Sequence, residues 1–225
     1  MAESVPQLVL IGRTRSRARL VKTAIALYDA AWERISSQHE HALSGLSRAI
    51  RNTKSVQRML DSQVTPRSAG EWLYQNLQEE FGEDRFVKVA EDLSALADCN
   101  LVVTASSSAQ PIVFPEHLSA APVVICDISV PADVSPEVLE KRPDVLVLRG
   151  GVVRLPENSD LLLNEASLPA GHTFACLAET ALLGLERHAH NFSFGEISKP
   201  DVDWILEVGR RHGFKLGYVT AQKTF

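Results

Sequence analysis

The sequence lacks an apolar run of about 18–20 residues, the length needed to cross a bilayer. Its N-terminus also lacks the basic, apolar and small-residue order of a signal peptide. The three cysteines, Cys99, Cys126 and Cys176, form no C-x-x-C pair and are odd in number, which argues against a disulfide framework and a zinc site. These absences predict a cytoplasmic protein with no membrane span and no bound metal.

Charge and aromatic content are also modest. The formal net charge is −5 and aromatic residues make up 6% of the chain, which gives no support to wholesale binding of nucleic acid. There is no internal repeat and no low-complexity segment. The 225 residues, 45% of them hydrophobic, are enough for one principal domain with a smaller appendage.

Short runs rich in β-branched residues recur along the chain, with helical or turn segments between them. Strands are predicted at 7–12, 85–90, 100–106, 122–129 and 145–151. Because these runs are nearly continuous in apolar residues, they favour a parallel sheet that is covered on both faces. The predicted fold class is α/β, a Rossmann-like doubly wound sheet, with C-terminal helices at about 173–189 and 200–212.

A long helical segment interrupts this pattern after the first strand. Its apolar residues recur on one seam of a seven-residue repeat, at Ile25, Tyr28, Trp32, Ile35, Ala42, Leu46, Ala49, Val56 and Leu60. His39 and Thr53 interrupt the seam, which favours a long amphipathic helix or a helical hairpin over a strict coiled coil. A further helix is predicted at 68–82. The seam either packs on the domain or joins a second copy of the chain.

Four arginines follow Gly12 at the end of the first predicted strand: Arg13, Arg15, Arg17 and Arg19. In dinucleotide-binding α/β folds, an acidic residue after the second strand selects NAD, whereas arginine accepts the 2′-phosphate of NADP. No acid lies between Leu8 and Lys22. The cluster indicates either an NADP-selective loop or the solvated start of a helix.

Small residues follow the later strands. Ser106, Ser107 and Ser108 come after one strand, and Gly150 and Gly151 follow another, where backbone would approach a flat ligand. Asp127 is predicted to end another strand, at a point where a loop residue would face the same crevice. Each of these features is equally consistent with an ordinary turn.

Cys176 lies near the start of a predicted helix. With Thr173 as the N-cap, Cys176 falls in the first turn, where unpaired amides and the helix dipole favour a thiolate. His172, four residues earlier, is placed to assist with a proton. The alternative is a cysteine that packs in the core.

The order of segments from about residue 7 to 219 resembles the long-chain acyl-[acyl-carrier-protein] reductases. The residues that carry the resemblance are "FACLAETALLGLE", "HNFSFG", "RRHGF" and "PDVLVLRGGVV". "SSSAQPIV" and "CDISVP" are also similar to segments of glutamyl-tRNA reductases and shikimate dehydrogenases, which supports the fold.

The resemblance implies a function and a set of site residues. Acyl-carrier protein or acyl-CoA would donate an acyl group to Cys176, with His172 and Glu179 as further catalytic residues, and NADPH would reduce it to an aldehyde. Cofactor contacts would come from Gly12, Arg13, Thr14, Arg17, Ser106, Ser107, Ser108, Asp127, Gly150 and Gly151. A non-catalytic assembly protein that associates through the 25–60 helix is the alternative.

No G-x-G-x-x-G motif occurs in the sequence. We therefore expect a Rossmann-like sheet without its first βα unit, in a fragment, a split subunit or a degenerate homologue, with a separate chain supplying the Gly-rich turn. Residues 1–155 are predicted to form the partial NADP-binding domain, with a helical insertion at about 22–84. Residues 156–225 are predicted to form a C-terminal helical segment that carries Cys176.

Overall fold

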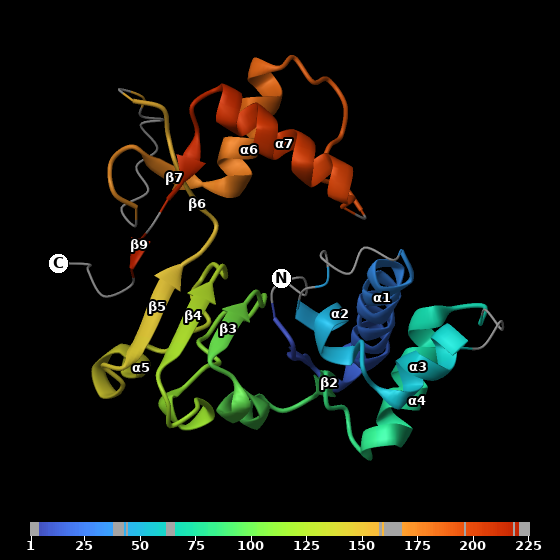
Figure 1. Cartoon of the computed structure of the whole chain (residues 1–225). Coiled ribbons are helices and arrows are strands. Elements are labelled where there is room, and N and C mark those ends of the chain that lie inside the picture. The colour runs from blue at the N-terminus through green and yellow to red at the C-terminus, as the bar shows by residue number, and fades with distance from the viewer. Residues whose placement is uncertain are drawn as a thin grey trace. The chain divides into compact units, whose positions relative to one another are not determined.

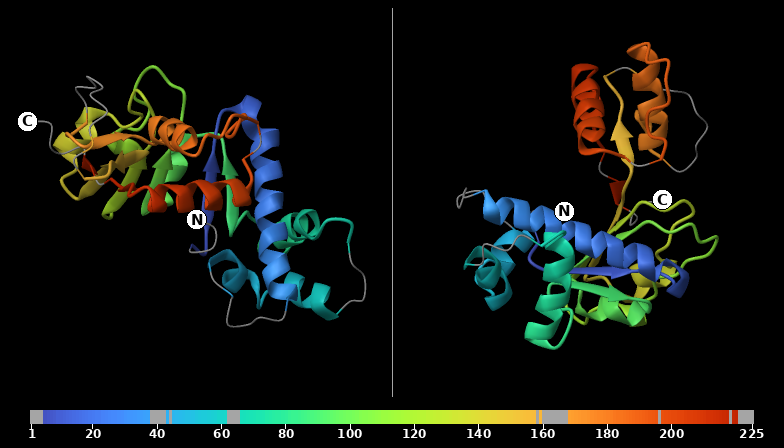
Figure 2. Two further views of the ribbon diagram at one scale, coloured as in Figure 1. Left: turned by 90° about the horizontal axis from the view of Figure 1, so that it is seen from above. Right: turned by 90° about the vertical axis from the view of Figure 1, so that its right-hand side faces the viewer.

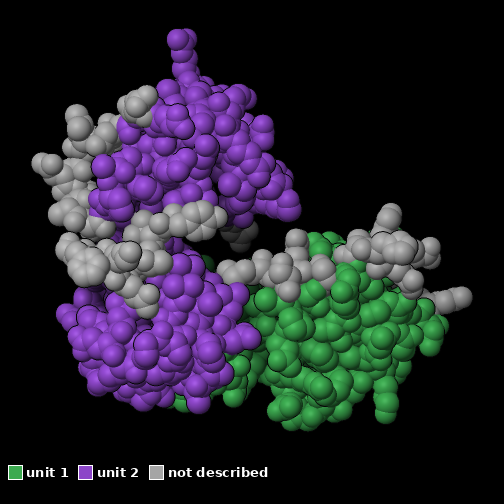
Figure 3. Space-filling view, turned by 60° about the vertical axis from the view of Figure 1, so that its left-hand side comes forward, with its two compact units in different colours: residues 1–99 green, residues 100–225 purple. Residues whose placement is uncertain are grey.

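The computed structural model describes residues 5–37, 43, 45–61, 66–157, 159, 168–195, 197–217 and 219–220. The chain divides into two compact units, residues 1–99 and residues 100–225 (Figure 3). The expected domain boundary near residue 155 stays a prediction. None of the described helices is long and apolar enough to cross a membrane.

Residues 1–99 form unit 1, which combines a parallel pair of strands with α-helices that lie between them in the sequence (Figure 1). Its elements are β1 (Leu8–Ile11), the 3-10 helix η1 (Thr14–Ser16), α1 (Arg17–Ser36), α2 (Gly45–Ile50), α3 (Lys54–Asp61), α4 (Ala69–Phe81), β2 (Val87–Ala90) and the 3-10 helix η3 (Leu93–Asp98). β1 pairs with β2 in register from Leu8↔Val87 to Ile11↔Ala90. The predicted helix at 68–82 is confirmed as α4, which ends at Gly82 in the left-handed conformation.

Helices α1 and α4 pack closely against each other, as the views of Figure 2 show. Gly70 makes this approach possible, because a Cβ built on it would lie 2.2 Å from the carbonyl oxygen of Ile25. At the same point, the Asp29 carboxylate of α1 accepts a hydrogen bond from the Gly70 N–H at 2.6 Å. Ser68 caps α4 by accepting a bond from the Glu71 N–H. The packing and the helix start are thus fixed together.

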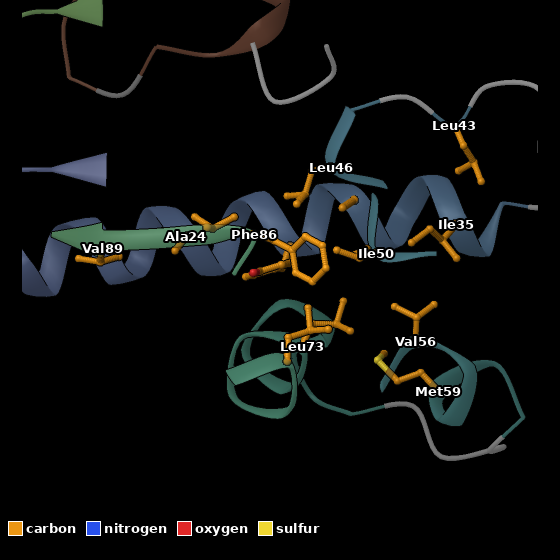
Figure 4. Packing of buried hydrophobic residues seen from close by; sticks show 14 residues of the cluster. Ala24, Ile35, Leu43, Leu46, Ile50, Val56, Met59, Leu73, Phe86 and Val89 are labelled. Carbon is orange, nitrogen blue, oxygen red and sulfur yellow. The ribbon is translucent and has the colours of Figure 1, made fainter. Parts of the chain in front are cut away.

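The apolar seam of the helical segment is largely buried inside unit 1 (Figure 4). Tyr28 and Ile35 of α1 join Leu46 of α2 and Val56 of α3 in one hydrophobic cluster with residues of α4 and β2. The described residues of the seam are divided among helices α1, α2 and α3. They therefore do not form one long helix or a coiled coil. Two of its residues, His39 and Ala42, lie outside the described residues. Packing within the unit therefore accounts for the seam without a second copy of the chain.

Residues 100–225 form unit 2, and its main sheet begins with the parallel strands β3, β4 and β5 (Figure 1). Its elements are β3 (Leu101–Thr104), the 3-10 helix η4 (Pro115–His117), β4 (Val123–Asp127), α5 (Pro136–Lys141), β5 (Val145–Arg149), β6 (Val152–Arg154), β7 (His172–Phe174), α6 (Ala175–Leu185), α7 (Lys199–Arg211), β8 (Lys215–Leu216) and β9 (Val219–Thr220). Parallel strands and helices in alternation confirm the predicted α/β, Rossmann-like fold class.

Side chains of β3 and β5 alternate between buried and exposed positions. Val102 is buried, whereas Leu101 and Val103 on the other face of β3 are 47% and 40% exposed. Burial on both faces, which the apolar runs predict, is therefore not observed for these two strands. The alternation is that of a sheet with one face packed on the core.

Antiparallel pairing in unit 2 is not predicted by the sequence. β9 pairs with β5, and β6 lies between β7 and β8 in a second small sheet. These strands are two to five residues long, too short for a two-residue periodicity to stand out. The register of β6 and β7 places Val152 opposite Phe174, directly before helix α6.

Replacing Gly70 with alanine tests the close approach of α1 and α4. The new methyl group would collide with backbone, which cannot move aside as a side chain can, so we expect a loss of about 1–3 kcal/mol in the free energy of unfolding. Chemical denaturation monitored by circular dichroism measures this loss. Gly184→Ala in α6 is the control, since a Cβ there meets nothing within 4 Å; an equal effect of the two substitutions would contradict the explanation.

Candidate functional site

The predicted cofactor residues of unit 1 lie together where β1 ends. Gly12 directly follows β1, and its N–H bonds to the Ala90 carbonyl at 3.1 Å, which extends the pairing with β2. Arg13 is extended and precedes η1, which contains Thr14, while Arg17 is the first residue of α1. The short 3-10 turn thus places Arg13, Thr14 and Arg17 beside the carboxyl end of the parallel pair.

The arginines of this edge differ in their partners. Arg17 forms an ion pair with Glu91, with 3.1 Å between its Nη1 and the Glu91 Oε1. Arg13, Arg15 and Arg19 are exposed, and no ion pair is found for them within the described part of the chain. The edge therefore keeps positive charge that a phosphate group could neutralise.

In unit 2, Ser106 and Asp127 belong to one buried hydrogen-bond network at the carboxyl ends of β3 and β4. Asp127 is 5% exposed and is the last residue of β4, inside the strand predicted at 122–129. Its carboxylate accepts bonds from the Thr104 hydroxyl and from the backbone N–H groups of Ser129, Asp133 and Val134. Four donors use its four acceptor positions, which favours a structural role; cofactor binding by Asp127 stays a prediction.

Asp133 is the second carboxylate of this network and is fully buried. It accepts bonds from the N–H and hydroxyl of Ser106, at 2.9 and 2.5 Å, and from the hydroxyl of Ser129. The Ser106 hydroxyl in turn accepts a bond from the Ser108 N–H at 3.0 Å. Ser107, between them, is exposed. The network therefore fixes the backbone of residues 106–108, the serine loop, and leaves the side chain of Ser107 facing solvent.

Gly150 and Gly151 connect this network to helix α6. The Gly150 N–H donates to the Asp127 carbonyl at 2.8 Å, and a Cβ on Gly150 would lie 2.3 Å from the Ile128 side chain. Gly151 has φ +67°, a conformation that favours glycine, and its carbonyl accepts a bond from the Ala175 N–H at 2.7 Å. Close packing and this turn explain both glycines, while direct contact with a cofactor stays a prediction.

Cys176 is the second residue of α6 and is exposed. The predicted position in the first turn is confirmed, but the predicted N-cap is wrong. Phe174 occupies the N-cap without a side-chain hydrogen bond, whereas Thr173 is buried in β7, opposite Val153 of β6. Thr173, which the sequence alone assigns to the helix start, is therefore part of a strand.

The two other predicted catalytic residues lie on either side of Cys176 in the chain. His172 is in β7, with its Nδ1 3.1 Å from the Ala170 carbonyl oxygen, and no hydrogen bond to Cys176 is found among the described residues. Glu179 is one helical turn beyond Cys176 and accepts a bond from the Ser193 hydroxyl at 2.5 Å. Glu179 therefore ties the segment after α6 to the helix that carries the cysteine.

Four residues of these sites are missed by the sequence reasoning: Glu91, Asp133, Arg149 and Ser193. Arg149 ends β5, and its guanidinium lies 5.2 Å from the ring centre of Phe174, the N-cap of α6. Glu91 directly follows β2, so its place after a parallel strand is a signal that the sequence does contain. Ser193 and Asp133 become visible only through contacts distant in sequence. In the described part of the chain, no group of three metal-ligating side chains gathers.

Comparison with known proteins supports the Rossmann-like fold for part of the chain. Residues 64–147 match the family model of shikimate / quinate 5-dehydrogenase. This region runs from before α4 into β5, and it includes the serine loop, Asp127 and Asp133. The match supports a Rossmann domain similar to that of the dehydrogenases. The matched residues do not include Cys176. They also do not include the arginine edge, which is the end of β1 with Arg13, Arg15, Arg17 and Arg19.

A curated protein, the aminotransferase PigE of Serratia sp. (strain ATCC 39006), is 32% identical to the chain over 120 residues. The alignment covers 52% of this chain but only 14% of PigE. The name of PigE describes that whole protein, most of which lies outside the alignment.

Asp133→Asn tests the buried network that holds the serine loop. The substitution replaces an acceptor oxygen by an NH₂ group facing donors of Ser106 or Ser129, so we expect a loss of about 1.5–3 kcal/mol in the free energy of unfolding. Asp203→Asn on α7 is the matched control, because its ion pair with Lys199 is exposed, and it should cost less than about 1 kcal/mol. Equal losses in urea denaturation would argue against a structural role for Asp133.

Proposed function

We propose that the chain is part of an NADPH-dependent reductase that converts a long-chain acyl thioester to a fatty aldehyde through an acyl group on Cys176. The acyl donor is acyl-carrier protein or coenzyme A. The observation that carries this proposal is the exposed thiol at the second position of α6, on a helix start anchored by the bond between Ala175 and Gly151. The dehydrogenase-like match and the resemblance of segment 174–186 support it.

Cys176 is favoured as the nucleophile over the other two cysteines. Cys99 and Cys126 are both half-buried. Burial raises the pKa of the Cys99 thiol, and nearby Asp98 adds to the effect, so Cys99 forms a thiolate less readily. Cys126 faces Gly150, where an added Cβ would lie 2.7 Å from its sulfur. Only Cys176 combines exposure with a helix N-terminus, whose amides favour negative charge.

The reaction takes two steps at the Cys176 sulfur. In the first, the thiolate attacks the thioester carbonyl, a C–S bond to Cys176 forms, and the bond to the donor breaks, so that the donor leaves as a thiol after taking up a proton. In the second, the acyl carbon accepts a hydride and the bond to Cys176 breaks, which releases an aldehyde and restores the thiolate. Bound NADPH would supply that hydride and leave as NADP⁺.

The side chains beside Gly12 fit a nucleotide with a 2′-phosphate. Arg13 and Arg17 would contact the phosphate, and Thr14 offers a hydroxyl next to them. Within unit 2, the small side chains of Ser106, Ser107 and Ser108 would leave room for a flat ligand at the carboxyl end of β3. A Gly-rich turn for the pyrophosphate would come from a partner segment, because the sequence contains no G-x-G-x-x-G motif.

Intact-mass measurement tests the first step. Incubation of the purified chain with a long-chain acyl-CoA should add one acyl mass that hydroxylamine removes, because an S-acyl group is a thioester. Cys176→Ala should abolish the adduct, while Cys99→Ala and Cys126→Ala should keep it. A folded chain without an adduct, or an adduct that persists in Cys176→Ala, would exclude the proposed nucleophile.

A charge reversal tests the arginine edge. Arg13→Glu combined with Arg17→Ala should reduce the ratio of NADPH to NADH affinity about tenfold or more, since two charge-assisted bonds to the 2′-phosphate are lost. Titration calorimetry with the two dinucleotides measures this ratio. Arg34→Glu combined with Arg58→Ala makes the same charge change elsewhere in unit 1 and should leave the ratio unaltered. An equal loss of both affinities in the first variant would show that the edge does not read the phosphate.

A further inference from the structure

The edge formed by β1 and β2 carries an acid among its arginines. Ile11 and Ala90 are paired at the end of the two strands, so the next residues, Gly12 and Glu91, leave the pair at the same edge. The Glu91 carboxylate pairs with Arg17 at 3.1 Å, and Thr14 is near enough to help lower the pKa of Glu91. Glu91 therefore lies beside two of the side chains expected to bind a nucleotide and is ion-paired with one of them.

The exposure of the ion pair favours a replaceable contact over a structural one. The Arg17 and Glu91 side chains are 53% and 32% exposed, and ion pairs in such surroundings contribute little to stability.

Glu91 also places a negative charge at this edge. Interaction with Thr14, followed by the interactions with Arg17, lowers the pKa of Glu91. The carboxyl group is therefore negatively charged at neutral pH and repels an incoming anion.

We propose that Glu91 is a specificity-determining residue that opposes binding of a 2′-phosphate. This inference rests on the proposed function, in which Arg17 and Thr14 contact that phosphate. In the free chain Glu91 is paired with Arg17. A 2′-phosphate that binds Arg17 has to displace the Glu91 carboxylate, and it is then repelled by that carboxylate, which remains nearby. Both effects weaken binding of a phosphorylated ribose and leave an unphosphorylated ribose largely unaffected.

The surrounding charges explain why the edge still favours a phosphate. Arg13, Arg15 and Arg19 are exposed, with no ion pair within the described residues, so one carboxylate does not cancel the positive charge of the cluster. Glu91 thus sets the degree of preference for the phosphorylated nucleotide, while the arginines set its direction.

Binding of two nucleotide fragments to the full chain tests this role. Adenosine 2′,5′-bisphosphate and adenosine 5′-monophosphate differ at the 2′-position alone, and calorimetry gives their affinities. Glu91→Gln should raise the affinity for the bisphosphate about five- to tenfold and change that for the monophosphate less than about twofold. Glu79→Gln is the matched control, since it removes one exposed negative charge from α4 of the same unit. It should change neither affinity.

The possible failures are distinct. If Arg17→Ala weakens bisphosphate binding but Glu91→Gln leaves it unchanged, Glu91 has no role in specificity and the proposed function stands. If Glu91→Gln lowers the affinity for the monophosphate, Glu91 binds the ribose hydroxyl and the inference is overturned. If neither wild type nor Glu91→Gln distinguishes the two nucleotides, the arginine edge does not read a 2′-phosphate, and the cofactor part of the proposed function falls with the inference. Thermal unfolding of each variant confirms that it is folded.

Discussion

The site of unit 2 depends on two buried acidic side chains, Asp127 and Asp133, whose oxygens accept hydrogen bonds from nearby donors. Among the described residues, neither of them forms an ion pair. Asp127 holds Thr104 and the backbone of residues 129, 133 and 134, while Asp133 holds Ser106 and Ser129. Buried charge is costly unless every acceptor is satisfied. Among the described residues, no buried side-chain nitrogen or oxygen lacks a partner. The ends of β3 and β4 and the loops after them are therefore held as one rigid group.

Unit 1 uses a different means of holding its edge. The β1–β2 pair is short. Helix α1, which runs from Arg17 to Ser36, carries exposed arginines at its start and packs against the other helices of unit 1 farther along its length. Gly70 and Asp29 hold α4 against α1. Gly70 has no side chain and allows the two helices to approach closely, and Asp29 accepts a hydrogen bond from the Gly70 N–H. The basic start of α1 is therefore a fixed surface, although its side chains face solvent.

The sequence predicts the parallel strands and most helices because their apolar periodicity is strong and local. It also predicts where Cys176 falls in its helix and where the arginines stand after β1. It misplaces Thr173 because the strand pairing of β7 with β6 outweighs the preference of threonine for a helix cap. It places Asp127 at the end of a strand but does not predict its burial, which depends on a network completed by Asp133. Glu91 is missed because its importance arises from the register of two strands that are separated by the whole helical segment.

The pairing that precedes α6 bears on which substitutions the start of the helix tolerates. Three residue pairs, from Val152↔Phe174 to Arg154↔His172, and the bond from the Ala175 N–H to the Gly151 carbonyl hold the start of α6 next to β6. Backbone groups make these bonds, and every residue except proline carries the N–H that they need. The side chains at 174 and 175 can therefore be exchanged for others without moving the residue at position 176 relative to β6.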